Sequence, residues 1–537
     1  MGIYGVDLGT SNCRIAKYDH GELIKTGDRG QSDFPSIIHF EDLSSINVGY
    51  SAMRPLIVEP EACVEYTKVR LGKEESIDIN VKGDKLSFSP QYITSLFLRH
   101  YSNYYKENMK NVVLTVPASY NEIQIKATIQ AAKMEGLEVI KVIEEPTAAM
   151  FSYLHSLYHR YGEDTLSPHL HKTFMVVDFG GGTLDISLVN IGVDEQGDIL
   201  PKVLYKEGST QIGGMDIDFM LMEYVLEALV EITRSEFAKE VKECLQYYRQ
   251  QYRYPEEISL EARAFLAELK ERIERVKIRL STKQDARLNL NDISDFNNLP
   301  ITRFDLNKVM GGRFLNTIEH CLQKTINESI LRTMPIDKVL VIGGSSKIPL
   351  IRQSVKRVAG RLEVIYPKEH NSSVASGAAI IGGINSGDHV KPFSNRSYHS
   401  CVSHDLLIQF EGGSPETLLK QGEAIPKEVL TREFTINYAL KESINFIIKE
   451  NYNDLNHRGD GDFKRVEKEI QSIRLYHPFF YKNDRIEVRL QLTQLGIWKV
   501  EATHALTNEK IDFHIEENQV LKTIELGGEK HVLFKEK

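Results

Sequence analysis

Hydrophobic and polar residues form their clearest pattern around one glycine-rich turn. The apolar run 174–177 precedes residues 178–185, which read Asp-Phe-Gly-Gly-Gly-Thr-Leu-Asp, and the alternating run 186–189 follows them. Strict alternation predicts a half-buried strand, and a short apolar run bounded by a turn is typical of a buried one. The pattern therefore predicts a strand, a tight turn and a second strand.

The same pattern occurs at the start of the chain, over residues 3–19. Four positions match the later turn at a constant offset of 171 residues: Val6, Asp7, Gly9 and Ile15 correspond to Val177, Asp178, Gly180 and Ile186. An internal repeat of this kind predicts two similar α/β halves. Each half would present a glycine turn at the end of its first hairpin, and the two turns would face each other across a cleft.

The residues between the two turns alternate between strand and helix patterns. Strands are expected at 112–116 and 139–143, and helices at 122–133 and from Glu144 onward, where a proline favours the first helical turn. Residues 155–172 contain four histidines and have no clean period. We expect this segment to form a long connection or an inserted loop.

After the second turn, two amphipathic helices are predicted over 219–232 and 266–280, because apolar residues recur there every three or four positions. A turn at 211–216 leads into the first of them. A third strand at 339–342 runs into a further glycine turn, 343–349, and then a helix. Backbone N–H groups at such a helix start could meet an anionic ligand.

The character of the sequence changes after Gly387. A polar stretch is followed by short alternating segments at 433–437, 444–449, 486–492 and 498–503, which predict strands. We therefore expect an α/β domain over residues 1–385, a linker over 386–397, an all-β domain over 398–520 and a C-terminal tail over 521–537.

Composition narrows the class of protein. The chain has 537 residues, 41% of them hydrophobic, and a formal net charge of −9, which argues against a nucleic-acid or anionic-membrane partner. Five scattered cysteines without a CxxC pair suit a reducing compartment, and no apolar run approaches the roughly 20 residues that span a bilayer. With no secretory signal at the start, we expect a cytoplasmic protein.

Three glycine turns in one α/β region point to phosphate binding. Glycines leave backbone N–H groups uncovered, so such a turn can surround a phosphate. The flanking aspartates Asp178 and Asp185 would repel a bare phosphate. An acidic phosphate-binding turn makes physical sense when Mg²⁺ lies between the carboxylates and the phosphate. A single glycine turn is usually only a turn, but two of these are repeated. The sequence lacks GxxxxGK[ST], and no GxGxxG opens a helix near its start, so neither a P-loop enzyme nor a dinucleotide-binding Rossmann domain is expected.

Six motifs together resemble the nucleotide-binding domain of the DnaK-type heat-shock protein 70 chaperones, in the actin and sugar-kinase superfamily. They are Val-Asp-Leu-Gly-Thr-Ser-Asn from Val6, Val-Pro-Ala-Ser-Tyr-Asn from Val116, Glu-Glu-Pro-Thr-Ala-Ala from Glu144, the turn from Asp178, Ile-Gly-Gly-Met-Asp from Ile212 and Ile-Gly-Gly-Ser-Ser-Lys-Ile-Pro from Ile342. The resemblance covers residues 1–385 and implies an actin-like ATPase domain with two duplicated lobes. The β domain is a fainter match to the family's peptide-binding sandwich.

The resemblance implies an ATP/ADP site with Mg²⁺. Asp7 and Asp178 would lie near the Mg²⁺ and hold it through water, and phosphoryl transfer then depends on positioning and charge neutralisation. The implied catalytic residues are Lys68, Glu145, Asp178, Thr183 and Asp185, with Glu145 and Asp185 orienting the attacking water. The implied nucleotide-binding residues are Asp7, Gly9, Thr10, Ser11, Asn12, Gly180, Gly181, Gly182, Gly213, Gly214, Glu274, Lys277, Ser281, Gly343, Gly344, Ser345 and Lys347.

Outside those motifs the sequence departs from the family where the two domains communicate. The polar linker 388–393 replaces an apolar one and is not expected to present an apolar strand to the ATPase domain. Ile125 stands where the family has a signalling arginine. Three positions that line the family's peptide-binding groove are occupied here by Glu411, Asn437 and Ile444, and only Ile444 is apolar. No helical pattern follows the β domain in this sequence, so we expect no helical lid.

Histidine and cysteine clusters offer only weak metal candidates. His155 and His159 are four residues apart, but no carboxylate completes a zinc pattern, and His399, Cys401 and His404 lack a fourth ligand. A solvated loop is the better interpretation of the first pair.

The expected function is that of an ATP-hydrolysing, chaperone-like protein whose β domain binds a polypeptide client or a dedicated protein partner according to nucleotide state. A co-chaperone or a nucleotide-exchange factor would be a further partner. The first alternative is a regulatory or scaffold protein that turns nucleotide over slowly and holds one fixed partner. The second is a small-molecule kinase of the same superfamily, which fits the motifs less well.

Overall fold

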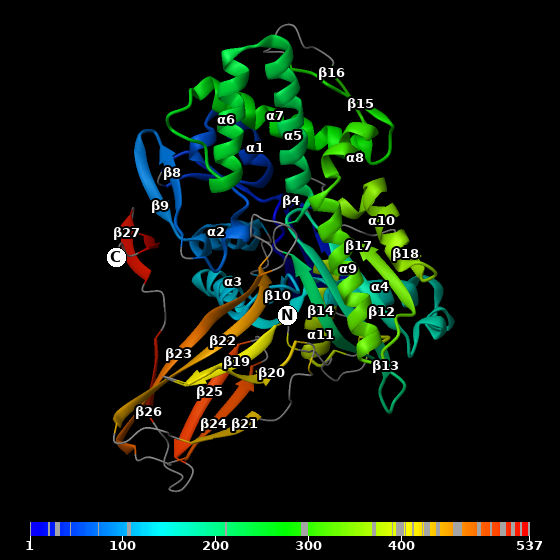
Figure 1. Cartoon of the computed structure of the whole chain (residues 1–537), viewed down its shortest axis with the longest axis vertical. Helices are drawn as coiled ribbons and strands as arrows, with labels where there is room; N and C mark the ends of the chain where they lie inside the picture. Colours follow the sequence, from blue (N-terminus) through cyan, green and yellow to red (C-terminus); the bar gives the residue numbers. More distant parts are fainter. Residues whose placement is uncertain are drawn as a thin grey trace.

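The computed structural model describes most of the chain. The described residues are 2–19, 22–26, 33–42, 44–73, 75–104, 109–209, 212–290, 299–367, 372–388, 390–393, 402, 404–410, 413–421, 423, 430–435, 441–454, 464–480, 485–493, 497–504, 512–516, 521–526 and 529–534. An α/β part carries helices α1 to α11, and an all-β part follows it along the chain (Figure 1).

Two mixed sheets with the same plan organise the α/β part. The first has the order β11 (Glu138–Glu144), β10 (Asn111–Val116), β1 (Ile3–Asp7), β2 (Asn12–Asp19) and β3 (Glu22–Thr26), with β4 (Phe34–Pro35) also paired to β2. The second has the order β14 (Ile199–Ser209), β13 (Leu184–Val193), β12 (Thr173–Phe179), β17 (Lys338–Ile342) and β18 (Glu363–Ile365).

In both sheets the strand before the glycine turn pairs antiparallel with the strand after it and parallel with a strand from later in the chain. This confirms the predicted duplication of an α/β unit. The strand before each turn is fully buried, as its unbroken apolar run predicts.

A shared core of buried residues lies between the sheets around α4 (Glu145–Tyr161) and α11 (Ser373–Asn385). The two helices approach closely at Gly377, where an added Cβ would lie 1.7 Å from the carbonyl oxygen of Ala148. Only glycine allows this contact, because any side chain would push the helices apart. The helices therefore pack closely together between the two sheets that carry the glycine turns.

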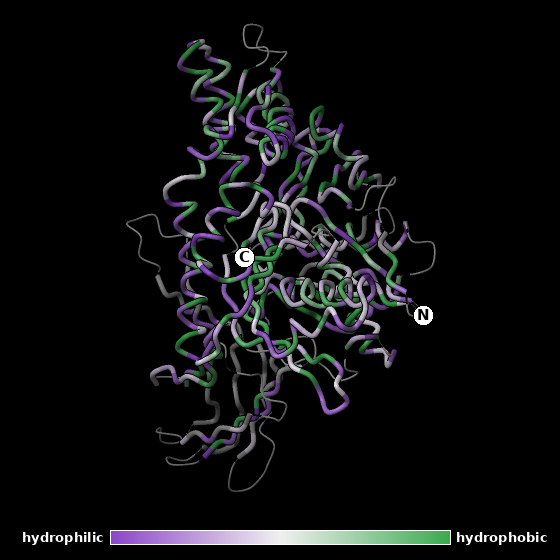
Figure 2. The backbone as a smooth tube through the Cα atoms, turned by 90° about the vertical axis from the view of Figure 1, so that its right-hand side faces the viewer, coloured by the Kyte–Doolittle hydropathy of each residue, from purple (hydrophilic) through white to green (hydrophobic). Residues whose placement is uncertain are grey.

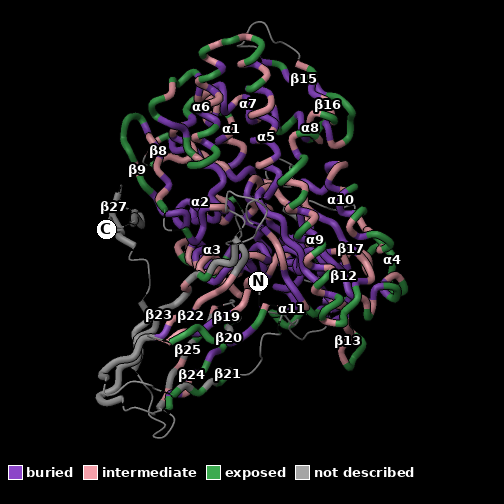
Figure 3. Tube along the Cα trace, viewed as in Figure 1, coloured by how far each residue is buried: buried purple, intermediate pink, exposed green. Residues whose placement is uncertain are grey.

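The remaining elements surround the sheets. They are β5 (Ile37–Phe40), β6 (Ile46–Val48), α1 (Met53–Val58), β7 (Cys63–Glu65), β8 (Ile77–Val81), β9 (Asp84–Phe88), α2 (Pro90–Tyr104), α3 (Glu122–Met134), α5 (Gly214–Thr233), α6 (Glu236–Gln251), α7 (Leu260–Leu280), β15 (Asp285–Leu288), β16 (Leu299–Thr302), α8 (Arg303–Met310), α9 (Arg313–Leu331) and α10 (Pro349–Ala359). Buried residues fill the centre of the α/β part, where the hydrophobic segments also gather (Figures 2 and 3). Among the described residues no helix is both long and apolar enough to cross a membrane.

The histidine-rich segment differs from the prediction of a loop. Residues 155–161 are the second half of α4, which ends at Gly162, and short 3-10 turns follow at Glu163–Thr165 and Ser167–His169. His155 is buried, and its ring lies 4.1 Å from that of His159 one helical turn later. The helical period was hidden because the buried face here carries an imidazole as well as aliphatic side chains.

The all-β part consists of two sheets. One has the order β20 (Glu416–Leu419), β19 (Asp405–Phe410), β22 (Lys441–Asp454), β23 (Lys464–Phe480) and β26 (Asp512–Glu516), and the other β21 (Leu430–Thr435), β24 (Arg485–Leu492) and β25 (Trp498–His504). The residues predicted as a tail form the hairpin β27 (Leu521–Leu526) and β28 (Glu529–Phe534). Glu411, Asn437, His399 and Cys401 lie outside the described residues, as does the side chain of Ile444.

The linker also differs from the prediction. Val390 and Phe393 are fully buried in the core between the sheets, and the ring of Phe393 lies 4.7 Å from that of Phe151. Phe393 bridges Ile199 at the edge strand β14 in parallel, and the Ile199 N–H donates to the carbonyl of Pro392. Two apolar residues three apart therefore suffice to anchor a linker that is polar on average.

Candidate functional site

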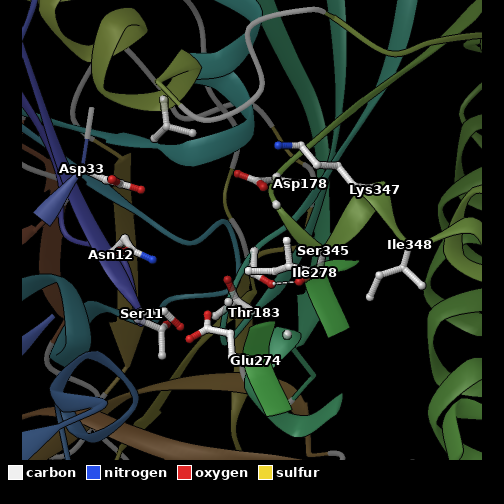
Figure 4. Close-up of a pocket in the computed structure, with 18 of the residues that line it drawn as sticks. Ser11, Asn12, Asp33, Asp178, Thr183, Glu274, Ile278, Ser345, Lys347 and Ile348 are labelled. Carbon is white, nitrogen blue, oxygen red and sulfur yellow. Dashed lines mark hydrogen bonds between the residues drawn. The ribbon is translucent and has the colours of Figure 1, made fainter. Parts of the chain in front are cut away.

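A cavity of about 650 Å³ lies between the two lobes, at the ends of their glycine turns. Figure 4 shows Asn12 and Asp33 on one side of this cavity and Lys347 and Ile348 on the other. Both lobes and helix α7 contribute to its lining. The structure therefore brings together residues that are more than 300 positions apart in the sequence.

The two glycine turns contact each other directly. An added Cβ on Gly181 would lie 2.6 Å from Oγ of Ser11, and one on Gly182 would lie 2.5 Å from Oγ1 of Thr10. Any side chain at these positions would separate the turns. The close approach brings residues of both turns into the lining of one cavity, and glycine turns of this kind suit an anionic group such as a phosphate.

Lys68 and Glu145 form a buried pair in the cavity lining. Lys68 lies on the 3-10 turn η3 (Thr67–Arg70), Glu145 is the first residue of α4, and Nζ of Lys68 donates to Oε1 of Glu145. Burial acts to lower the pKa of Lys68, but Glu145, Tyr120 and Asp7 together outweigh it and raise the pKa. Burial raises the pKa of Glu145 to about 7, against the pull of Lys68. The pair places one fixed cation beside a weakly acidic carboxyl group.

Asp7 and Asp178 occupy equivalent positions at the ends of β1 and β12 and both line the cavity. Burial raises the pKa of each, and the neighbouring carboxylates of Glu145, Asp185 and Asp7 raise that of Asp178 further. This excess of negative charge, built from oxygen donors, fits a Mg²⁺ ion. Among the described residues no three His, Cys, Asp or Glu side chains converge as direct metal ligands.

Asp185 lies just behind the cavity and is fully buried. The backbone N–H and Oγ of Ser119 both lie 3.2 Å from its Oδ1 and donate to it. Burial raises the pKa of Asp185, and a hydrogen bond from Thr183 opposes that shift. Asp185 is therefore placed behind Thr183, which does line the cavity.

The opposite end of the cavity is built from α7 and the turn after β17. Glu274, Lys277 and Ser281 share one face of α7, and Nζ of Lys277 lies 2.5 Å from Oδ2 of Asp218 and 3.0 Å from the carbonyl of Gly214. The Ser345 hydroxyl donates to the carbonyl of Gly180 at 2.7 Å. These bonds attach the third glycine turn to the second, so that one cavity serves all three.

Most of the predicted site residues lie in this cavity. The lining includes Asp7, Gly9, Thr10, Ser11, Asn12, Lys68, Glu145, Asp178, Gly180, Gly181, Thr183, Gly214, Glu274, Lys277, Ser281, Gly343, Gly344, Ser345 and Lys347. Gly182, Gly213 and Asp185 stand behind it; a Cβ on Gly213 would lie 2.3 Å from Cα of Gly182. These three support the turns rather than face the cavity.

Seven further residues line the cavity and were missed from the sequence: Arg14, Asp33, Ile278, Thr282, Ile348, Arg352 and Val374. A signal existed for two of them. Arg14 shares a strand face with Asn12 two residues earlier, and Ile278 follows Glu274 by one helical turn. Asp33 sits in a segment without a periodic pattern, so only the tertiary structure places it.

Comparison with known proteins agrees with this architecture. The family model described as Hsp70 protein matches residues 3–246 and 235–527. A chaperone protein DnaK from Nitrosopumilus maritimus (strain SCM1) is 30% identical over 440 residues, which make up 79% of this chain and 62% of that protein. The chain thus spans less than two thirds of that relative's length. Both the cavity and the all-β part fall within the matched residues.

Proposed function

The chain belongs to the Hsp70 protein family, and on that premise we propose that it is an ATP-hydrolysing, chaperone-type protein. ATP or ADP binds with Mg²⁺ in the cavity between the lobes, and the β domain holds a polypeptide client or a dedicated protein partner. The observation that carries the proposal is the buried Lys68–Glu145 pair, set beside the two repeated aspartates in one cavity.

The chemistry assigned to this chain is positioning rather than covalent catalysis. The backbone N–H groups of the two turns, with Thr10 and Thr183, bind the phosphates. Glu145 orients a water toward the terminal phosphorus, Asp185 supports the site from behind Thr183, and Lys68 offsets the negative charge that develops on the phosphoryl oxygens. Asp7 and Asp178 would hold a Mg²⁺ ion through its waters, and that ion would neutralise phosphate charge. Lys277 and Glu274 contact the nucleoside from α7.

Coupling between the domains is proposed to pass through residues 119–122. Nε2 of His404, next to the start of β19, donates to the carbonyl of Ser119 at 3.1 Å, and Oε2 of Glu450 accepts from the N–H of Glu122 at 3.3 Å. Ser119 itself binds Asp185, and the Tyr120 hydroxyl donates to the carbonyl of Lys68. The β domain thus contacts a turn that touches two of the proposed catalytic residues.

A binding experiment tests this function against the alternatives. The full chain is presented to a library of unfolded peptides with ATP and with ADP, and the proposal expects binding to many peptides, weaker with ATP. One dominant copurifying protein, bound equally in both states, would favour a scaffold with a single partner. Transfer of labelled γ-phosphate to a metabolite would favour the kinase.

A further inference from the structure

Arg14 is a cation in the cavity that the family motifs do not include. It lies on β2, directly opposite Asp7 in the register of the first hairpin, so the two side chains share one face of the sheet. Its side chain lines the cavity and is 19% exposed. It therefore stands at the phosphate end, beside the first glycine turn.

The guanidinium of Arg14 is only loosely paired. NH1 lies 3.9 Å from Oδ2 of Asp7, and NH2 lies 3.4 Å from Oδ2 of Asp33, whereas a strong charge-assisted bond is about 2.7–2.9 Å long. Its Nε is buried without a hydrogen-bond partner among the described residues. Buried donors of this kind normally have a partner, so the group has capacity to bind an anion.

Asp33 holds the guanidinium in place from the far side. The Tyr50 hydroxyl donates to Oδ1 of Asp33 at 3.3 Å, which fixes the carboxylate while its other oxygen faces Arg14. Burial lowers the pKa of Lys347, and the nearby cations Arg14 and Arg352 lower it further. Cations therefore converge on the cavity from both lobes. The arrangement directs positive charge toward the space between the two turns.

We propose that Arg14 is a phosphate-binding residue that takes over part of the charge neutralisation otherwise left to the divalent ion. This inference rests on the proposed nucleotide site and deepens it. A nucleotide polyphosphate entering between Asp7 and Asp178 meets strong repulsion when Mg²⁺ is absent, and a permanent cation 3.9 Å from Asp7 reduces it. Binding of ADP should therefore depend less on Mg²⁺ in this chain than it would without Arg14.

Calorimetric titration of ADP into the full chain, once with Mg²⁺ and once with EDTA, tests the inference. The measured quantity is the dissociation constant of ADP with EDTA divided by the dissociation constant with Mg²⁺. In Arg14→Met this ratio should rise by about tenfold over wild type, because one charge-assisted contact matters most when the ion is missing. Arg14→Gln should behave in the same way, and Arg14→Lys should keep part of the wild-type ratio because it keeps the charge.

Arg99→Met is the matched control. Arg99 lies on α2 outside the cavity, and its Nε donates to Oε2 of Glu135 at 2.9 Å. Its loss should leave the ratio at the wild-type value. An unchanged ratio in both neutral Arg14 variants would overturn the inference alone. A wild-type chain that binds no ADP even with Mg²⁺ would overturn the nucleotide site as well.

Discussion

Nζ of Lys68 donates a hydrogen bond to Oε1 of Glu145, and the two side chains are only 8% and 7% exposed. They are 77 residues apart in the sequence and come from a 3-10 turn and a helix start. Removing one member of such a pair leaves the other charge buried without compensation. The pair is therefore a sensitive point for both stability and chemistry.

Replacing Lys68 by methionine should abolish most ATP hydrolysis while nucleotide still binds. Lysine here offsets charge that develops only in the transition state, and loss of such a group costs about 10²–10³ in rate. The measurement is the steady-state rate of phosphate release together with the dissociation constant of ATP.

Lys206→Met is the control for Lys68→Met. Lys206 is buried and pairs with the partly buried Glu144, the residue next to Glu145, but neither lines the cavity. This variant should lose stability and keep its rate constant. Equal rate losses in the two variants would mean that Lys68 acts only through stability.

Another buried pair joins α7 to β7. Nζ of Lys270 on α7 donates to Oε2 of Glu65 on β7, and the Tyr248 hydroxyl donates to the same oxygen at 2.7 Å. Lys270→Met should lower the free energy of unfolding by about 3–5 kcal/mol, because Glu65 is left buried and uncompensated. Urea denaturation measures this loss. Lys239→Met, which breaks an exposed pair, should change almost nothing.

The buried linker residue Phe393 should control how the linker docks. Phe393→Ala removes a fully buried ring, at a cost of about 3–5 kcal/mol, and should release the linker from β14. Hydrogen exchange at the Ile199 amide, which donates to Pro392, reports the release directly. Phe304→Ala removes a ring that is 75% exposed and should leave this amide as protected as in wild type. Unchanged protection in Phe393→Ala would contradict the docked linker.

The contact made by His404 should weaken in acid. Burial lowers the pKa of His404 to about 4, opposed by the Ser119 carbonyl and Glu207 and reinforced by Lys206 and Lys324. An undocked ring titrates near 6.5. Protons therefore bind the undocked state preferentially between pH 6.5 and 4, and docking is lost as the pH falls through that window. Energy transfer between labels on the two domains measures the change.

His404→Gln supplies the control for this titration, because an amide can still donate to the Ser119 carbonyl but has no proton to gain in this range. Its domain contact should be independent of pH from 8 to about 5. A pH response that is the same in the variant and in wild type would assign the change to other groups.

Local patterns predicted the two duplicated hairpins, since an apolar strand, an aspartate and glycines fall within a few residues of one another. Lys277 and Ser281 on α7 came from the family resemblance and not from a local pattern. Asp33 could not be predicted, because its place beside Arg14 depends on a loop that has no repeating pattern. The position of Asp33 in the site is determined by packing between segments that are distant in the sequence.

The predictions for the linker and for the histidine-rich segment were wrong for a related reason. Average polarity concealed Val390 and Phe393, whose burial depends on an edge strand almost 200 residues earlier. His155 was predicted to lie in a loop, although it lies on the buried face of helix α4. In both cases the identity of single residues mattered more than the composition around them.

The most direct test of the central claim is single-turnover release of γ-phosphate from ATP bound to the full chain with Mg²⁺. Glu145→Gln and Asp178→Asn are compared with wild type, and Glu144→Gln serves as the neighbouring control outside the cavity. Wild type and Glu144→Gln should release phosphate at similar rates, and the two cavity variants should be slower by about a hundredfold or more. Equal rates in all four proteins would contradict the assignment of this cavity as a site of ATP hydrolysis.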